Sequence, residues 1–97
     1  MIINKGSEEF DWDKGNRDKP KKHGVTIEEA EEAFFDDKKV VFSDWEHSAK
    51  EKRSTLLGKT REERLLNITY TIRRKKIRII TARDINRREA QLYEKAA

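Results

Sequence analysis

Two runs of strand-forming residues near the C-terminus constrain the fold of this chain more than any other feature. Residues 65–72 and 77–82 are rich in Ile, Leu, Thr and Tyr, and only the cations of residues 73–76 separate them. Strands joined by so short a turn must pair antiparallel, because a parallel return needs a crossover of about a dozen residues. Residues 40–43 and 51–57 are also long enough for strands, which predicts a meander of three or four antiparallel strands.

Helix signals lie on both sides of this meander. A Thr-x-x-Glu capping box beginning at Thr26 precedes apolar residues at helical spacing, which predicts a helix from residue 27 to about 35. Asn86 is a candidate cap for a C-terminal helix at residues 86–95. Residues 44–50 have no periodic pattern and are predicted to form a loop.

The N-terminal part completes the predicted fold. Residues 1–9 form a polar lead-in, and residues 10–13 alternate apolar and acidic side chains as a short strand does. Residues 13–23 could form a further helix, although Pro20 lies inside it and would break or delay it. The sequence therefore predicts a single α+β domain at residues 10–97, with the sheet, the N-terminal strand, two helices packed on one face and a C-terminal helix.

Charge is divided unevenly along the chain. Lys plus Arg minus Asp plus Glu gives 8 − 13 = −5 for residues 1–49 and 15 − 6 = +9 for residues 50–97, which recovers the net charge of +4. A concentrated positive field attracts phosphates or carboxylates, so the second half predicts a nucleic-acid or acidic-protein partner.

Composition excludes several other classes of protein. The chain has no cysteine and only two isolated histidines, so we expect no disulfide, no metal site and no cofactor. No apolar run approaches the roughly 20 residues of a membrane span, and the N-terminus lacks the features of a signal peptide. These observations predict a cytoplasmic protein.

A series of short motifs follows the chain from residue 10 almost to its end. They are Phe10-x-Trp12-Asp13, Gly15-Asn16-x-x-Lys19, Lys22-His23-Gly24-Val25, Glu29-Ala30-x-x-Ala33-Phe34, Arg61-x-x-Arg64-Leu65-Leu66, residues 77–83, and Arg87-Arg88-Glu89 with Tyr93-Glu94. In this order the motifs resemble the BrnT toxin family of type II toxin–antitoxin modules. The chain departs from the family pattern after Lys19, where Pro20 replaces the usual Asn.

The resemblance implies a small ribonuclease whose fold is similar to that of the RelE-type toxins. It also implies an RNA substrate, whose cleavage would inhibit translation and growth. The partner would be a BrnA-like antitoxin that carries a ribbon-helix-helix DNA-binding module, and from this we expect a 2:2 complex.

RNA cleavage without a metal ion needs a base for the 2′-hydroxyl, positive charge at the phosphorane and an acid for the leaving oxygen. His23 is the candidate for proton transfer, because an imidazole with a pKa of about 6.5 takes and gives protons near neutrality. Arg53, Arg78 and Arg83 are the candidate catalytic cations, because a guanidinium can hold two phosphate oxygens at once. The alternatives are that His23 only ends a helix ahead of Gly24, and that Arg83 forms a structural salt bridge to the first helices.

Side-chain alternation limits how these cations can meet. A regular strand at residues 77–82 places Arg78 and Arg83 on opposite sides, so they share a face only if the strand bulges or ends near Ala82. Four further residues are candidate contacts to the substrate: Lys22, Arg87, Arg88 and Tyr93. For each there is a structural alternative, such as a solvated lysine at a helix end or an arginine that is compensated by Glu89.

Three functions remain open at this point. The first is a metal-independent endoribonuclease toxin. The second is a catalytically inactive module of the same fold that only engages the antitoxin, and the replacement at Pro20 favours it. The third is a plain single-stranded RNA binder, which is the least favoured because residues 73–88 contain no aromatic side chain to stack on bases.

Overall fold

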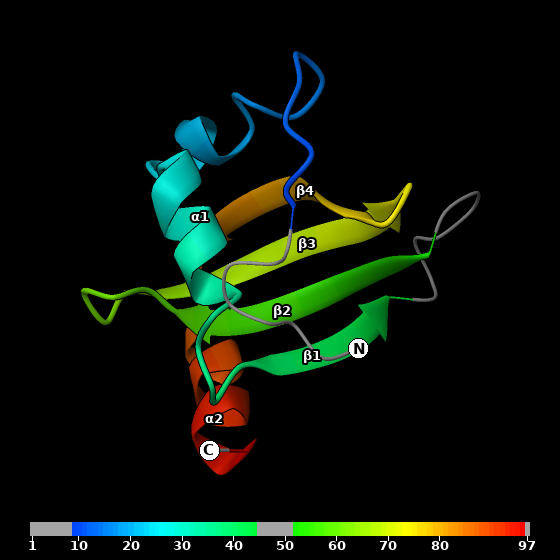
Figure 1. Cartoon of the computed structure of the whole chain (residues 1–97). Coiled ribbons are helices and arrows are strands. Elements are labelled where there is room, and N and C mark those ends of the chain that lie inside the picture. The colour runs from blue at the N-terminus through cyan, green and yellow to red at the C-terminus, as the bar shows by residue number, and fades with distance from the viewer. Residues whose placement is uncertain (1–8, 45–51, 97) are drawn as a thin grey trace.

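The computed structural model describes residues 9–44 and 52–96, which form a four-stranded antiparallel sheet with helices (Figure 1). The strands are β1 (Val40–Asp44), β2 (Arg53–Lys59), β3 (Leu65–Arg73) and β4 (Lys76–Asp84). The helices are the 3-10 helix η1 (Pro20–His23) and the α-helices α1 (Ile27–Ala33) and α2 (Arg87–Ala96). Strands that are neighbours in sequence are neighbours in the sheet, so the predicted α+β class and antiparallel meander are confirmed.

The β3–β4 hairpin carries an irregularity that the sequence does not reveal. Its register shifts between Thr69 and Tyr70, where Ile80 of β4 is the extra residue of a β-bulge. An extra residue reverses the alternation of side chains, so Ile79 before the bulge and Ala82 after it are both buried in the core.

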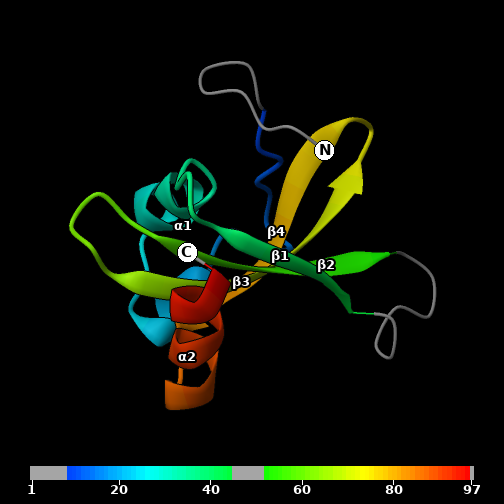
Figure 2. The ribbon, with the colours of Figure 1, turned by 90° about the horizontal axis from the view of Figure 1, so that it is seen from below.

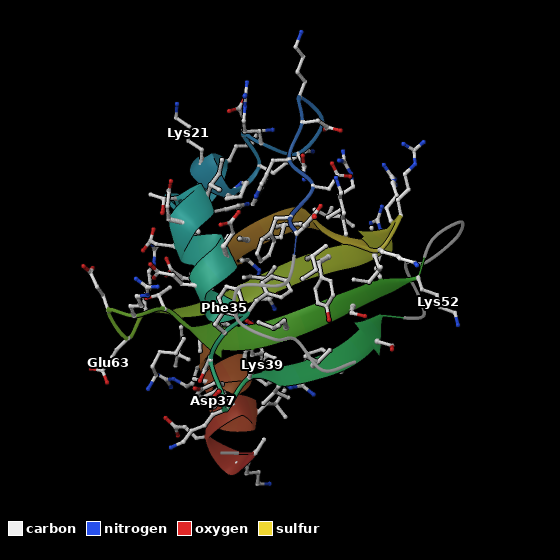
Figure 3. All side chains as sticks on the ribbon, viewed as in Figure 1. Lys21, Phe35, Asp37, Lys39, Lys52 and Glu63 are labelled. Carbon is white, nitrogen blue, oxygen red and sulfur yellow. The ribbon has the colours of Figure 1, made fainter. Side chains whose placement is uncertain are left out.

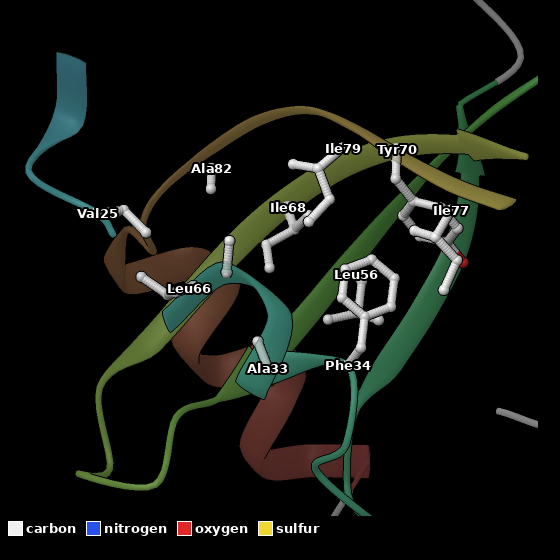
Figure 4. Packing of buried hydrophobic residues seen from close by; sticks show 11 residues of the cluster. Val25, Ala33, Phe34, Leu56, Leu66, Ile68, Tyr70, Ile77, Ile79 and Ala82 are labelled. Atoms are coloured by element: carbon white, nitrogen blue, oxygen red, sulfur yellow. The ribbon is translucent and has the colours of Figure 1, made fainter. Parts of the chain in front are cut away.

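Helix α1 covers one face of the sheet and begins with the predicted capping box. Thr26 Oγ1 accepts from the N–H of Glu29, and Glu29 Oε1 accepts from the N–H of Thr26, both at 3.0 Å. The ring of Phe34 packs edge-on against those of Phe10 and Tyr70, with centroids 5.4 and 4.9 Å apart. The buried core between α1 and the sheet consists of Val25, Ala30, Ala33, Phe34, Leu56, Leu66, Ile68, Tyr70, Ile77, Ile79 and Ala82 (Figure 4).

The end of α1 packs directly on the backbone of β2. A Cβ atom added to Gly58 would lie 2.4 Å from the carbonyl oxygen of Ala33, a distance that real Cβ atoms do not reach. Glycine is therefore required at this position, because it lets the helix end approach the strand and close the core.

Helix α2 lies on the opposite side of the sheet from α1 (Figure 2). Leu57 follows the core residue Leu56, so alternation directs it to this second face, where it is fully buried. Tyr93 of α2 is 4% exposed, and its hydroxyl donates to Asp36 Oδ2 at 2.6 Å. Helix α2 therefore covers one end of the second face.

The N-terminal region differs from the prediction of a strand at residues 10–13 and a helix at residues 13–23. Phe10 forms a single parallel bridge to Ile77, and turns occupy the chain up to η1. Pro20 stands at the start of η1, because proline lacks the N–H that a helix interior requires but is accepted in a first turn. The expected pair of early helices is thus one α-helix preceded by a single 3-10 turn.

Parts of two predicted segments lie outside the described residues. These are the polar lead-in at residues 1–9, of which only Glu9 is described, and the loop at residues 44–50, of which only the backbone of Asp44 is described. Within the described ranges, no helix has both the length and the apolar character needed to cross a membrane.

Candidate nucleic-acid interface

A small hollow opens beside β4, at the end of the sheet away from α2. Its volume is about 200 Å³. It is lined by Gly15, Asn16, Lys19, Arg53, Thr71, Arg73, Arg78 and Ile80. Half of these side chains are cationic, and they come from the N-terminal turns and from β2, β3 and β4, so the fold alone brings them together. We call this site the cationic hollow.

The β-bulge places the two arginines of β4 on one face. Arg78 pairs with Thr71 and Arg83 pairs with Asn67, and these two β3 residues lie four positions apart on the same side of a regular strand. The condition under which Arg78 and Arg83 can share a face is therefore met. They remain at different ends of that face, with Arg78 in the cationic hollow and Arg83 beside α2.

Two carboxylates of the N-terminal segment hold Arg78 in place. Its Nη1 and Nη2 donate to Asp13 Oδ2 and Oδ1, both at 2.9 Å, and Nη1 also lies 3.5 Å from Asp11 Oδ2. The Arg78 guanidinium and the N–H of Gly15 lower the pKa of Asp13, and the pKa of Arg78 is raised in return. The side chain is only 13% exposed, so Arg78 is a preorganised charge with a fixed direction.

Asn16 fastens the N-terminal segment to β4. Its Nδ2 donates to the carbonyl oxygens of Asp11 at 2.9 Å and of Ile79 at 2.8 Å, and its Oδ1 accepts from the N–H of Asp13 at 2.8 Å. The residue is 3% exposed. These three bonds keep the carboxylate of Asp13 beside Arg78 and close one wall of the cationic hollow.

The remaining cations add to the positive potential of the hollow. Arg53 is exposed near the start of β2, Arg73 is exposed at the end of β3, and Lys19 is exposed just before η1. The charge of Arg73 also contributes to the lowered pKa of Asp13, which places its guanidinium in the same local field. Like charges gathered around one space form a favourable site for a phosphate group.

The structure places His23 and Lys22 elsewhere. His23 is the exposed last residue of η1, followed by Gly24 in the left-handed region at φ 70°. Lys21 of the same short helix and Lys52 beside Arg53 lie at opposite ends of the molecule in Figure 3. Among the described residues, the lining of the cationic hollow includes neither His23 nor Lys22. The predicted meeting of an imidazole with Arg53 and Arg78 is therefore not seen at this site.

Arg83 belongs to the attachment of α2. Its Nη1 and Nη2 donate to Glu89 Oε1 and Oε2 at 2.9 and 2.8 Å, and Nη1 also donates to the carbonyl oxygen of Asp84 at 3.0 Å. The hydrogen bonds and charge of Glu89 raise the pKa of Arg83. A salt bridge was the structural alternative for Arg83, and the structure shows one, but to the last helix rather than to the first helices.

The other predicted substrate contacts lie on α2. Arg87 and Arg88 are exposed in its first turn, which also contains Glu89, whose carboxylate accepts from Asn67, Arg83 and the N–H of Asn86. Burial, together with the neighbouring carboxylate of Asp36, raises the pKa of the Tyr93 hydroxyl to about 12. Its ring also lies 5.8 Å from the ammonium of Lys59. In this position Tyr93 does not offer a ring face on which a base could stack.

Six residues that line the cationic hollow were not among the predicted site residues: Gly15, Asn16, Lys19, Thr71, Arg73 and Ile80. Lys19, Asn16 and Gly15 all belong to the Gly15-Asn16-x-x-Lys19 motif, and that motif was the available signal for them. Arg73 belongs to the run of cations between the two predicted strands, and no local pattern marks its place in the hollow. Its place in the hollow depends on the pairing of β3 with β4.

Comparison with known families agrees with the resemblance in the sequence. A family model described as "Ribonuclease toxin, BrnT, of type II toxin-antitoxin system" matches residues 12–89. That span includes η1, α1, the whole sheet and every residue that lines the cationic hollow. A comparison with curated proteins gives no match. Since the family model covers well over half of the chain, the protein belongs to the BrnT family, the ribonuclease toxins of type II toxin–antitoxin systems.

Proposed function

We propose that this toxin cleaves RNA without a metal ion and that the cationic hollow receives the scissile phosphate. The observation that carries the proposal is the convergence of Lys19, Arg53, Arg73 and Arg78 on one small space beside β4. A phosphorane carries more negative charge than the phosphate from which it forms. Fixed cations therefore stabilise the transition state more than the bound substrate.

The chemistry we propose is attack by the 2′-hydroxyl of the RNA on the adjacent phosphorus. The bond from the 2′-oxygen to phosphorus forms as the bond to the 5′-oxygen breaks, which leaves a 2′,3′-cyclic phosphate. The proton of the attacking hydroxyl passes to the carboxylate of Asp13, which Arg78 holds beside the hollow. The ammonium of Lys19 donates a proton to the leaving oxygen. Arg78 orients Asp13 and stabilises the phosphorane.

The charge of the same space supports the proposal of metal independence. Four cationic side chains repel a divalent cation by the same Coulomb interaction that attracts a phosphate. We therefore expect cleavage by the purified protein to continue in excess EDTA. Loss of cleavage in EDTA, restored by Mg²⁺, would contradict this part of the proposal.

A comparison of three variants on labelled RNA tests the site. Arg78→Ala should lower cleavage by about 100-fold or more, the usual effect of removing a group that stabilises transition-state charge. Arg78→Lys should recover part of the activity, because it restores the charge without the bidentate geometry. His23→Ala should cleave as the wild type does, because His23 lies outside the hollow. Loss of activity in His23→Ala with full activity in Arg78→Ala would reverse the assignment.

An inactive module that only binds the antitoxin is the second candidate function. The observation that favours it is the engagement of Arg78 by Asp13 and Asp11, since these carboxylates compete with a phosphate for the guanidinium. Pure protein that cleaves none of a panel of RNAs, yet binds the antitoxin tightly, would support this candidate against the ribonuclease.

We also infer that the antitoxin is a ribbon-helix-helix protein that covers the positive surface in a 2:2 complex. The charge of +9 on residues 50–97 supports an acidic arm as the contacting segment. Coexpression with the adjacent small reading frame, followed by light scattering, measures the stoichiometry. An arrangement of sheet and helices like that of the RelE-type toxins is part of the same inference, and superposition of a crystal structure tests it.

A further inference from the structure

Phe42 of β1 is an aromatic side chain that the fold leaves partly in solvent. It is 41% exposed, and among the residues that the structure describes no other aromatic side chain is exposed. Phe42 pairs with Thr55 of β2, and Thr55 lies two positions before Leu57, which is buried on the face that α2 covers. Residues two positions apart in a strand, and residues paired across two strands, share a face. Phe42 therefore lies on the same face of the sheet as α2.

A row of hydroxyl groups crosses this face from Phe42. The strand registers pair Phe42 with Thr55, Thr55 with Thr69, and Thr69 with Thr81. Thr55 is 8% exposed, and Thr69 and Thr81 are half-buried. We call Thr55, Thr69 and Thr81 the threonine row. Because their side chains are short, they form a polar floor with the ring of Phe42 at its β1 end.

The cationic hollow borders the threonine row on the same face. Arg53 and Thr71 each lie two positions from a member of the row on the same strand, and Arg78 pairs with Thr71. All three of these residues line the cationic hollow. Phe42 is a diagonal neighbour of Arg53 across β1 and β2, at a separation of about 7–8 Å. The sugar and base of one nucleotide can span such a separation.

These groups match the parts of a nucleotide. The cations suit its phosphate, the hydroxyls suit the polar edges of sugar and base, and an exposed ring suits the face of the base. A protein partner would instead require a contiguous apolar patch. The next exposed apolar residue of β1, Val41, pairs with the core residue Leu56 and so faces the other side of the sheet. Phe42 thus supplies, from a distant strand, the aromatic side chain that residues 73–88 lack.

We propose that Phe42 and the threonine row form a base-binding subsite, in which the ring stacks on the base of a nucleotide next to the scissile phosphate. The proposal rests on the function proposed for the cationic hollow. Every base has a face that can stack, so the subsite selects an unpaired base rather than a particular sequence. A base inside a duplex is already stacked on its neighbours. The substrate class is therefore RNA that is single-stranded at the cleavage site.

Four variants of β1 test the subsite through binding to a single-stranded 2′-O-methyl oligonucleotide, which cannot be cleaved. Phe42→Ala should weaken binding by about 10-fold or more, the loss that corresponds to one base–aromatic stack. Phe42→Leu keeps an apolar side chain for the fold but has no ring, and it should also bind more weakly. Phe42→Trp should bind at least as tightly as the wild type. Val41→Ala is the matched control, because Val41 is 47% exposed on the same strand but faces the other side, and it should bind as the wild type does.

A series of oligonucleotides that each lack one base locates the contact. Loss of the base at one position should weaken wild-type binding by about 10-fold, and loss at that position should make no difference to Phe42→Ala. Phenylalanine has no charge, so Phe42→Ala should keep the wild-type slope of log Kd against log salt. Arg78→Ala should make that slope shallower by about 0.7, for one lost phosphate contact. Binding to a duplex should not distinguish Phe42→Ala from the wild type.

The outcomes separate this proposal from the function on which it rests. Equal binding by Phe42→Leu, Val41→Ala and the wild type, with cleavage that still depends on Arg78, would overturn the subsite and retain the ribonuclease. So would light scattering that shows self-association through Phe42 while RNA binding does not respond to the ring. The expected differences in binding, with no RNA cleaved by the wild type, would retain the subsite and reject the mechanism. A wild type that binds no single-stranded RNA would overturn both.

Discussion

The carboxylate of Glu89 makes several of the contacts that attach α2 to the sheet, which makes Glu89→Gln an informative substitution. Glu89 accepts from Arg83 Nη1 and Nη2 at 2.9 and 2.8 Å, from Asn67 Nδ2 at 2.6 Å and from the N–H of Asn86 at 3.0 Å. Its side chain is 15% exposed. Glutamine preserves the size of the side chain but removes its charge, and it presents an amide N–H₂ to groups that are themselves donors.

The loss of unfolding free energy expected for Glu89→Gln can be worked out from these contacts. A hydrogen bond to a charged group contributes about 1.5–3 kcal/mol, and a buried polar group left unpaired costs about 1–3 kcal/mol. The side chain of Arg83 is 40% exposed, so solvent screens much of the contribution of its ion pair with Glu89. Most of the loss then comes from the hydrogen bonds that Glu89 accepts from Asn67 and from the N–H of Asn86 at the helix cap. We expect Glu89→Gln to lower the free energy of unfolding by about 2 kcal/mol. For a domain of this length that corresponds to a Tm lower by about 8–16 °C.

Urea denaturation followed by circular dichroism measures this loss. The control is Glu94→Gln, an exposed glutamate on the same helix, which should change the free energy of unfolding by less than about 0.5 kcal/mol. A double-mutant cycle with Arg83→Ala gives the part that belongs to the ion pair. If Glu89→Gln were no more destabilising than the control, the carboxylate would not be what holds α2 on the sheet.

Three further substitutions have clear expected outcomes. Gly58→Ala should cost about 3 kcal/mol or more in urea denaturation, because the added Cβ would meet the backbone of α1 at 2.4 Å; a cost below about 1 kcal/mol would refute this packing. Arg64→Ala should cost about 2 kcal/mol by the same assay, because the guanidinium joins Asp84, Glu29 and the carbonyl of Gly24; a neutral result would show that this network does not stabilise the fold. Burial raises the pKa of Asp36, but hydrogen bonds from the Tyr93 hydroxyl and two backbone N–H groups lower it more, so its folded pKa lies below the usual 3.8. The stability that the Asp36 carboxylate adds is therefore present above pH 3.8 and is lost as the pH falls through its lower folded pKa. Asp36→Asn should flatten the acid limb of a plot of unfolding midpoint against pH. An unchanged acid limb would refute a part for Asp36 in acid unfolding.

The regular elements could be predicted because each carries its own local signal. The capping box at Thr26 and the alternation at residues 65–72 depend on neighbouring residues, and both are seen in the structure. The helix expected at residues 13–23 is replaced by turns and η1 because Pro20 excludes a helix interior, and the sequence already contained that objection.

The candidate site was harder to predict because it depends on pairing between distant segments. The bulge at Ile80 arises from the fit of β4 to β3, and without it Arg78 and Arg83 would be assigned to opposite faces. The role of Asn16 depends on a carbonyl group 63 positions away, and no local pattern indicates it. The cations could be recognised from the sequence, but the grouping of Arg53, Arg73 and Arg78 in one hollow could not.

The way in which the N-terminal segment borders β4 has a consequence for the order of folding. Asp13 and Asn16 are synthesised more than sixty positions before their partners Arg78 and Ile79. Contacts of such long sequence separation must wait for the intervening chain and require the closure of a large loop. During synthesis the acidic side chains therefore remain unengaged until the last hairpin emerges. The wall of the cationic hollow is then completed only after the sheet behind it has formed.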